Sequence, residues 1–174
     1  MTDYFSNHYT ETGSAQTAVD RNWKTSAGIG HARLRYKACR YTGQPQTTDL
    51  VRLMTFKSSD RLVKLVVSAP GTPTAGTLNV GAHLSGLNHD GAVIDADIFA
   101  TALDTTGALA QSESLTENAL EHEDRAKPLW EQASEVTATY TADPGVDIDI
   151  TITPAVNTDA SQEYLVEAWY TAGD

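Results

Sequence analysis

The chain has 174 residues, a length that one hydrophobic core can serve, and its 40% hydrophobic and 20% charged residues are ordinary for a globular domain. A formal net charge of −11 argues against nucleic acid as the main partner, because phosphate binding needs concentrated lysine and arginine. No apolar stretch approaches the ~20 residues that cross a bilayer, and the first residues lack the pattern of a secretory signal.

The charge is divided unevenly along the chain. Residues 1–65 carry ten basic and five acidic side chains and the remaining residues carry two basic and 18 acidic ones, so the two parts have net charges of +5 and −16. Neighbouring subunits could use this division, because opposite potentials steer association and fix register. The alternative is that the two sets interleave in the fold and cancel locally.

The first thirty residues differ from the rest. Small polar residues dominate there without any period, and four isolated aromatic residues stand among them: Tyr4, Phe5, Tyr9 and Trp23. We therefore predict an extended N-terminal arm over residues 1–30 and one folded domain over residues 31–174. Such an arm either frays in solvent or docks on a neighbouring subunit.

Alternation of apolar and polar residues, the period of a half-buried strand, is the main structural signal in the rest of the chain. Residues 31–40 alternate and predict a strand with a basic outer face. The expected core side holds Leu34, Tyr36 and Ala38, and the expected solvent side holds Arg33, Arg35 and Lys37. Cys39 falls on the basic side and, as the one cysteine, cannot form an internal disulfide.

Two strongly apolar segments follow, at residues 50–56 and 61–69. The short polar residues 57–60 between them suit a hairpin turn, so the two segments are expected to pair with each other. Residues 77–84 alternate again and predict a further strand.

Two short helices are expected in the middle of the chain. Asp95 could cap the first, which ends near Gly107, because Ile98, Phe99, Ala102 and Leu103 have helical spacing. Pro128 could open a second helix of one turn.

The last third returns to strands, at residues 135–141, 146–153 and 163–171. The second of these is the clearest alternation in the chain, with isoleucines opposite aspartates and threonines. Some seven strands in one domain need a second sheet to cover their apolar faces. The predicted fold is therefore all-β, an antiparallel and jelly-roll-like β-sandwich with one or two short helices and an extended N-terminal arm.

The sequence contains no recognised catalytic motif. It lacks a nucleophile elbow, a Walker loop, a dinucleotide fingerprint and a zinc-protease motif. Its five histidines stand in loops or at polar strand positions, which favours surface histidines: His8, His31, His83, His89 and His122. We expect a protein that is not an enzyme and that uses no cofactor.

Acidic residues raise the question of a metal. Asp90, Asp95 and Asp97 offer the oxygen ligands that calcium prefers, but their spacing is not that of an EF-hand loop, and a helix cap explains Asp95 equally well. Asp147 and Asp149 alternate with isoleucines and are typical of a solvated strand face. We therefore expect no metal site.

Four parts of the chain resemble a family of small structural proteins that tailed bacteriophages encode beside the major capsid protein, the capsid decoration, cement or auxiliary head proteins. These parts are the Thr/Tyr-rich start with residues 28–33, the strands 49–53 and 61–67, the segments 76–81 and 92–100, and residues 127–131. The resemblance is one of overall layout and covers most of the chain.

The resemblance implies a virion protein that binds the outer surface of the capsid and stabilises it. Its partners would be the major capsid protein and its own copies in a homotrimer, with no nucleic acid and no membrane, after synthesis in the host cytoplasm. Interfaces favour aromatic and arginine anchors. The expected contact residues are Tyr4, Phe5, Tyr9, Trp23, Arg33, Arg35 and Lys37.

A carbohydrate-binding or receptor-binding module of a phage fibre or spike is the alternative function, because β-sandwiches serve both roles. That function needs an exposed aromatic platform. Trp130 and Trp169 are available, but their positions beside a helical turn and within a strand favour packing in the core.

Overall fold

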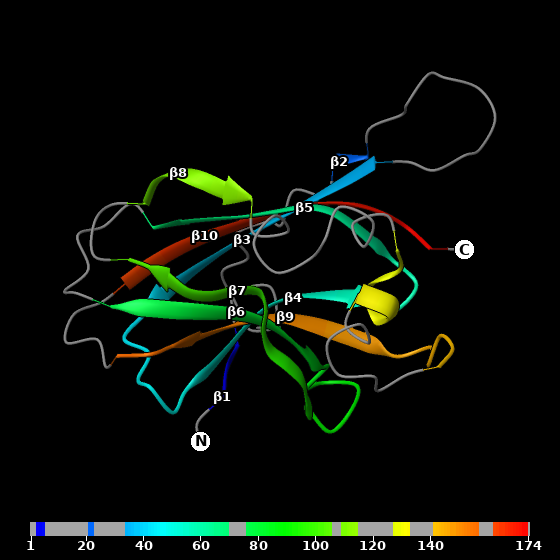
Figure 1. Ribbon diagram of the computed structural model, residues 1–174, viewed down its shortest axis with the longest axis horizontal. Helices are drawn as coiled ribbons and strands as arrows, with labels where there is room; N and C mark the ends of the chain where they lie inside the picture. Colours follow the sequence, from blue (N-terminus) through cyan, green and yellow to red (C-terminus); the bar gives the residue numbers. More distant parts are fainter. Residues whose placement is uncertain are drawn as a thin grey trace, which may run out of the picture.

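The computed structural model shows two stacked five-stranded sheets (Figure 1). It describes residues 3–5, 21–22, 34–69, 76–105, 109–114, 127–132, 141–156 and 162–173. Sheet A consists, in spatial order, of β1 (Asp3–Phe5), β4 (Leu50–Lys57), β9 (Asp147–Pro154), β6 (Thr77–Leu84) and β7 (Val93–Asp104). Sheet B consists of β2 (Arg21–Asn22), β3 (Leu34–Gly43), β10 (Gln162–Thr171), β5 (Arg61–Ala69) and β8 (Leu109–Ser114). The predicted all-β sandwich is confirmed.

The strand order is that of a jelly roll with one short strand added to each sheet. Along the chain, β3, β4, β5 and β6 alternate between sheet B and sheet A, β7 stays beside β6, and β8, β9 and β10 alternate again. Each sheet therefore combines strands from both halves of the chain, as a jelly roll requires. The ladders are antiparallel except the one between β1 and β4, which is parallel.

The expected hairpin between residues 50–56 and 61–69 is wrong. β4 lies in sheet A beside β9 and β5 lies in sheet B beside β10, so the turn between them crosses from one sheet to the other. The Asp60 carboxylate holds this turn, because it accepts hydrogen bonds from the backbone N–H of Lys57 at 2.9 Å and of Gly173 at 3.1 Å. A short polar turn suits this crossing as well as a hairpin, and the packing of the strands decides between them.

The expected helix after Asp95 is also wrong, because Val93–Asp104 forms β7. Its register with β6 shifts three times, so that Val80 lies opposite Ala100 whereas Ala82 lies opposite Asp95. Bulges insert extra residues into one strand and interrupt the period of two. As a result, the buried residues of β7 recur at intervals that resemble those of an amphipathic helix.

The core fills the space between the two sheets, and strands of both contribute to it. Its largest fully buried apolar side chains are Phe56, Phe99, Leu53, Met54, Leu62, Leu65, Leu78, Leu129, Ile148 and Ile150. Burial of one such side chain stabilises the fold by about 1.5–3 kcal/mol. The isoleucines of β9 therefore face the core, as the alternation in the sequence predicts.

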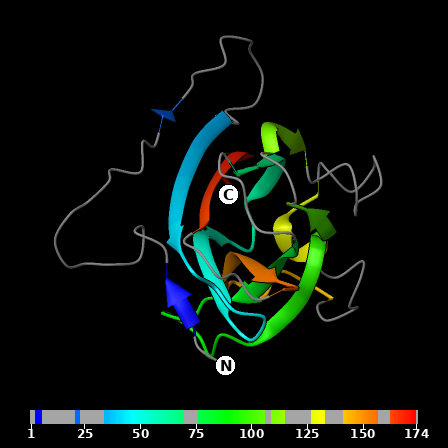
Figure 2. The same ribbon diagram turned by 90° about the vertical axis from the view of Figure 1, so that its left-hand side faces the viewer.

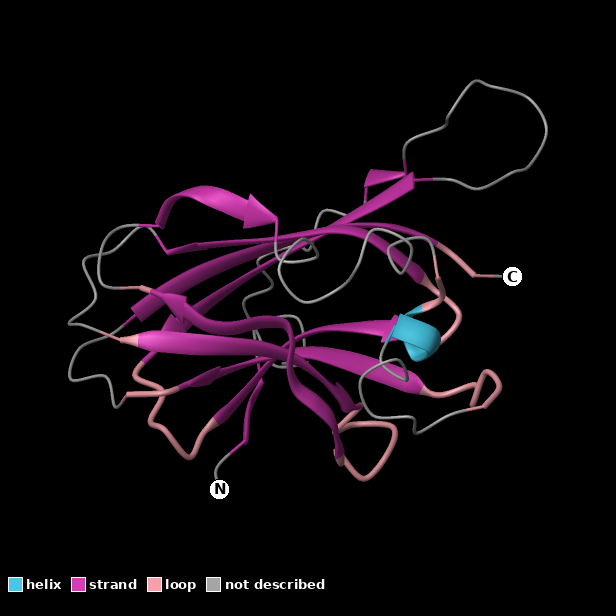
Figure 3. Ribbon diagram, in the orientation of Figure 1, coloured by secondary structure: helices cyan, strands magenta, loops and turns pink. Residues whose placement is uncertain are grey.

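One helical turn, residues 129–132, is present where Pro128 predicts it (Figure 3). Its Leu129 joins the core, whereas Trp130 is half-buried and outside it, so the expectation that Trp130 packs in the core is wrong. The expected strand at 135–141 falls almost wholly outside the described residues. Among the residues that the structure describes, no helix has the length and apolar content of a membrane span.

Candidate interaction surfaces

Two short strands of the predicted arm extend the edges of both sheets (Figure 2). Tyr4 and Phe5 belong to β1, whose backbone pairs in parallel with that of β4. β2 pairs antiparallel with β3, which places Arg21 opposite Tyr36. Three of the expected contact residues, Tyr9, Trp23 and Arg33, lie outside the described residues. Contact between the arm and a partner stays a prediction.

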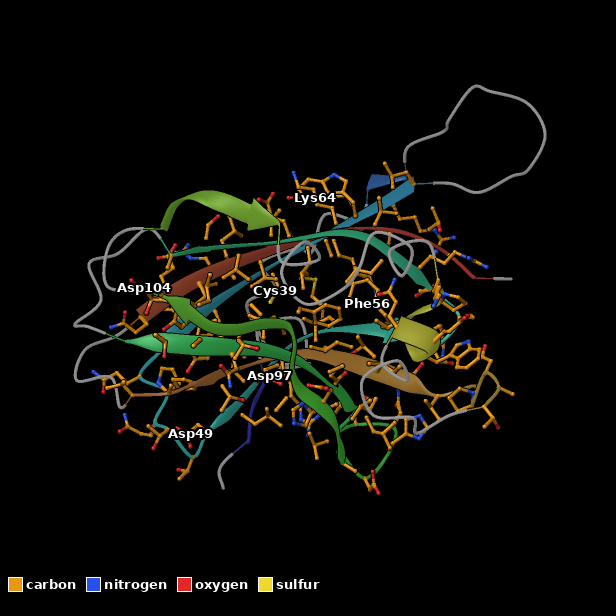
Figure 4. All side chains as sticks on the ribbon, in the orientation of Figure 1. Cys39, Asp49, Phe56, Lys64, Asp97 and Asp104 are labelled. Carbon is orange, nitrogen blue, oxygen red and sulfur yellow. The ribbon has the colours of Figure 1, made fainter. Side chains whose placement is uncertain are left out.

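The faces of β3 are the reverse of those expected. Cys39 and Tyr41 are buried in the core, and Arg35 and Lys37 share their side of the strand. Tyr41 fixes this orientation, because its ring stacks on Tyr164 of β10 with centroids 6.2 Å apart. Figure 4 shows Cys39 and Phe56 between the two sheets. The basic face of the strand is thus the inner one, and the prediction of a basic outer face is wrong.

The two inward cations lie near one open end of the sandwich, where long side chains can reach inward and still meet solvent. The Lys37 ammonium donates to the Thr55 carbonyl oxygen at 2.7 Å. It also lies 4.5 Å from the ring centroid of Phe56 and 5.2 Å from that of Tyr170, which is a cation–π geometry. Phe56 and Tyr170 meet edge to face at 4.9 Å across the sheets.

These residues line an open pocket of about 470 Å³, which we call the end pocket. It is lined by Arg35, Lys37, Thr55, Phe56, Lys57, Asp60, Asp147, Tyr170, Ala172 and Gly173. In its wall Lys57 Nζ lies 2.6 Å from Asp147 Oδ1, and Asn88 Nδ2 donates to Asp147 Oδ2 at 2.5 Å.

The paired charges in this wall shift each other's ionisation. Burial alone raises the pKa of Asp147, but hydrogen bonds from Lys57 and Asn88 and the charge of Lys57 outweigh burial and hold this pKa below its usual range. The pKa of Lys57 is raised, chiefly by the hydrogen bond with Asp147 and by that carboxylate's charge. The pair is therefore ionised at neutral pH.

The outer face of sheet B carries an aromatic pair. The side chains of β10 alternate between buried and half-buried, so Tyr170 enters the core and Trp169 turns outward. Trp169 packs against Tyr36 of β3 at 5.1 Å, and the Lys64 ammonium of β5 lies 5.2 Å from its ring. The expectation that Trp169 packs in the core is wrong.

Charged groups flank this pair on the same face. The Tyr36 hydroxyl donates to the Glu167 carboxylate, and Arg40 pairs with Glu163 at 2.6 Å. Figure 4 shows Lys64 on the outer side of sheet B. We call this set the sheet B patch: Tyr36, Arg40, Lys64, Glu163, Glu167 and Trp169.

The outer face of sheet A contains a buried ion pair where a solvated face is expected. Asp149 is fully buried (0% exposed) and pairs with Arg52, itself 1% exposed, at 3.0 Å. Arg52 also donates to the carbonyl oxygens of Leu84 at 2.8 Å and Gly91 at 3.0 Å, which anchors the loop between β6 and β7. A Cβ added to Gly91, whose φ is +72°, would lie 2.6 Å from the guanidinium. The prediction of a solvated carboxylate at Asp149 is wrong.

Histidine placement differs from expectation at one position. His83 is buried, and its Nδ1 lies 2.9 Å from the Thr151 hydroxyl oxygen. His89 is exposed as expected and accepts a hydrogen bond from the Asp147 N–H at 3.0 Å. The alternation of β6 conceals the burial of His83, because His83 and Gly81 are buried although they alternate with the core residues Val80 and Ala82.

The three acidic residues weighed for calcium do not converge. Asp95 is buried in β7 and accepts a hydrogen bond from the Asp97 N–H at 3.0 Å, whereas Asp90 is exposed in the preceding loop. Burial is the main cause that raises the pKa of Asp95. Within the ranges that the structure describes, no three histidine, cysteine or acidic side chains are arranged to hold a metal ion.

Comparison with known proteins concerns the fold. The sequence matches no family model and no curated protein. A chain of the cyanophage Pam1 capsid asymmetric unit is 19% identical, with a TM-score of 0.45 over 93% of this chain and 98% of that chain. A chain of the capsid of Ralstonia phage GP4 is 15% identical, with a TM-score of 0.52 over 99% of this chain and 97% of that chain. The protein thus shares its fold, over nearly its whole length, with a chain of the GP4 capsid.

Proposed function

We propose that this protein is a non-enzymatic structural component of a tailed-phage virion that binds the outer surface of the capsid and stabilises it. The observation that carries the proposal is the jelly roll shared with a chain of the Ralstonia phage GP4 capsid over 99% of the present chain. Its partners in this proposal are the major capsid protein and further copies of itself in a homotrimer.

The proposed mechanism is thermodynamic. A protein that binds only the assembled shell stabilises that state by mass action, by about 2.7 kcal/mol per site when its free concentration is a hundred times its dissociation constant. Many copies on one particle multiply this effect. A rigid jelly roll suits the role, because its surfaces are ordered before binding and lose little conformational entropy in the complex.

The sheet B patch and the arm are the surfaces that we assign to these contacts. The patch combines tryptophan, tyrosine and arginine, the residue types that are enriched at the centres of protein interfaces. Trp169 and Tyr36 are held in place by each other and by Lys64 and Glu167, so they can bind without being reordered. The arm pairs with the edge of the same sheet through β2, where Arg21 lies opposite Tyr36.

The test is binding to capsids that lack the protein. Trp169→Ala and a deletion of residues 1–30 are each expected to weaken binding at least tenfold, because a buried aromatic side chain contributes about 1.5–3 kcal/mol and 1.4 kcal/mol is a factor of ten. Binding is measured by co-sedimentation at matched salt, since surface charges respond to ionic strength.

Leu87→Ala is the matched control, because Leu87 is 61% exposed in the loop beyond sheet A. It is expected to bind as the unaltered protein does. Equal binding by the deletion variant and the full chain would refute the role of the arm. Failure of the full chain to bind any such capsid would refute the decoration role.

A carbohydrate-binding or receptor-binding role is the second candidate, and the outward position of Trp169 beside Tyr36 is the observation that favours it. Aromatic side chains on an outer sheet face can stack on sugar rings. Saturable binding to a glycan array that Trp169→Ala abolishes, together with no binding to capsids, would support this role over the first.

A further inference from the structure

The end pocket contains an arginine, Arg35, that has no anionic partner among the residues that the structure describes. Arg35 belongs to β3 and its side chain is half-buried. Its Nε is buried and has no hydrogen-bond partner, and its guanidinium forms no ion pair with the described side chains. A buried donor that lacks an acceptor is unfavourable, so an acceptor supplied from outside would be bound at this place.

The two carboxylates in the pocket wall are already engaged elsewhere. Asp147 receives Lys57 on one oxygen and Asn88 on the other. Asp60 receives the backbone N–H of Gly173 on one oxygen and that of Lys57 on the other. All four carboxylate oxygens thus serve the fold, and none is committed to Arg35.

We propose that the end pocket is a carboxylate-binding site in which Arg35 receives an acidic side chain of a partner polypeptide. A guanidinium presents parallel N–H groups that match the two oxygens of a carboxylate. The surroundings favour a single negative charge, because the described lining carries three basic and two acidic side chains. A phosphate dianion would be repelled by Asp60 and Asp147.

The size and position of the pocket indicate a polypeptide as the source of the carboxylate. About 470 Å³ exceeds what one carboxylate fills and leaves room for the stem and backbone of an acidic residue. Phe56 and Tyr170 line the same space and can contact that stem. The site does not depend on the proposed virion role, because it is defined by its chemistry alone.

The experiment is a titration of the ¹⁵N-labelled full chain, in which the Arg35 Nε–H resonance is followed by NMR. The probes are the capped peptides Gly-Glu-Gly and Gly-Gln-Gly, acetate and inorganic phosphate. The glutamate peptide is expected to shift this resonance saturably and to bind at least tenfold more tightly than the glutamine peptide. Weaker binding by acetate than by the glutamate peptide supports a polypeptide source, and equal binding overturns that source.

Arg35→Gln is expected to lower the affinity for the glutamate peptide at least tenfold. Arg61→Gln is the matched control, because it removes the same charge from an exposed position of β5 that does not line the end pocket, and it is expected to bind like the unaltered protein. Arg35→Lys keeps the charge but loses the parallel N–H groups of the guanidinium, so its affinity for the glutamate peptide is expected to lie between those of Arg35→Gln and the unaltered protein. This variant replaces Arg35→Gln in the test if Arg35→Gln does not fold. An unshifted Arg35 resonance, or tighter binding of phosphate than of the glutamate peptide, overturns the proposal.

Discussion

Replacement of Arg52 by methionine tests the buried ion pair on which the outer face of sheet A depends. Arg52 and Asp149 are both excluded from solvent, and the pair connects β4 to β9 at 3.0 Å. Removal of one partner leaves the other as an uncompensated buried charge, which costs about 3–5 kcal/mol. The free energy of unfolding of a whole domain is about 5–15 kcal/mol, so Arg52→Met should remove a large part of it.

Urea denaturation measures this loss. With an m-value of about 2 kcal/mol/M, the midpoint should fall by about 1.5–2.5 M. The double variant Arg52→Met with Asp149→Leu should lose clearly less than the sum of the two single variants, because no isolated charge remains. Arg40→Met, which breaks an exposed pair with Glu163, should change the stability by at most about 1 kcal/mol. A loss below about 1 kcal/mol for Arg52→Met would contradict the assignment.

Three further changes test the unusual course of β7. Gly81→Ala should destabilise the fold by at least about 1–3 kcal/mol in urea denaturation, because the added Cβ would lie 2.3 Å from the backbone of Ala96; an unchanged midpoint would disprove this close contact. Ala102→Gly should stabilise it by about 0.5–1 kcal/mol, because Ala102 has a φ of +52° that glycine adopts without strain; destabilisation would argue against this backbone conformation. Asp95→Asn should raise the melting temperature at pH 7 but not near pH 3. Burial raises the pKa of Asp95 in the folded state, so the protonated side chain leaves the folded state at its full stability below the unfolded pKa of about 3.9. As the pH rises through the folded pKa, the side chain ionises and that stability is lost, whereas asparagine stays neutral. Equal differences at both pH values would contradict the role of its charge.

The sequence predicts the strands of this fold better than their partners. Period-two alternation locates β6, β9 and β10 to within a residue or two, because each buries one side in a continuous core. The alternation does not indicate which of the two sheets a strand belongs to. The β4 to β5 turn therefore reads as a hairpin, although a jelly roll sends the two strands to opposite sheets. The bulges of β7 remove the alternation itself and leave a false helical signal.

The candidate surfaces could be anticipated only in part. Arg35, Lys37 and Trp169 attract attention in the sequence as basic and aromatic residues, but the side of the strand on which each lies is wrong for all three. In β3 two alternating sets of side chains could face the core: leucine, tyrosine and alanine, or arginine, lysine and cysteine. Hydrophobicity favours the first set, yet the packing of Tyr41 and Cys39 further along the strand buries the second. Burial of a long cation becomes acceptable because Lys37 finds two aromatic rings and a carbonyl oxygen at the open end.

Both proposed surfaces depend on the register of the same two strands. β3 and β10 pair along ten residues, and at one end of this ladder Trp169 lies opposite Tyr36 while Tyr170 lies opposite Arg35. Successive residues point to opposite faces, so the sheet B patch and the end pocket alternate along one ladder. A slip of one residue would exchange the two surfaces. The buried stack of Tyr41 on Tyr164 opposes that slip, so a pair of core residues keeps Trp169 on the outer face of sheet B and Arg35 on the inner face.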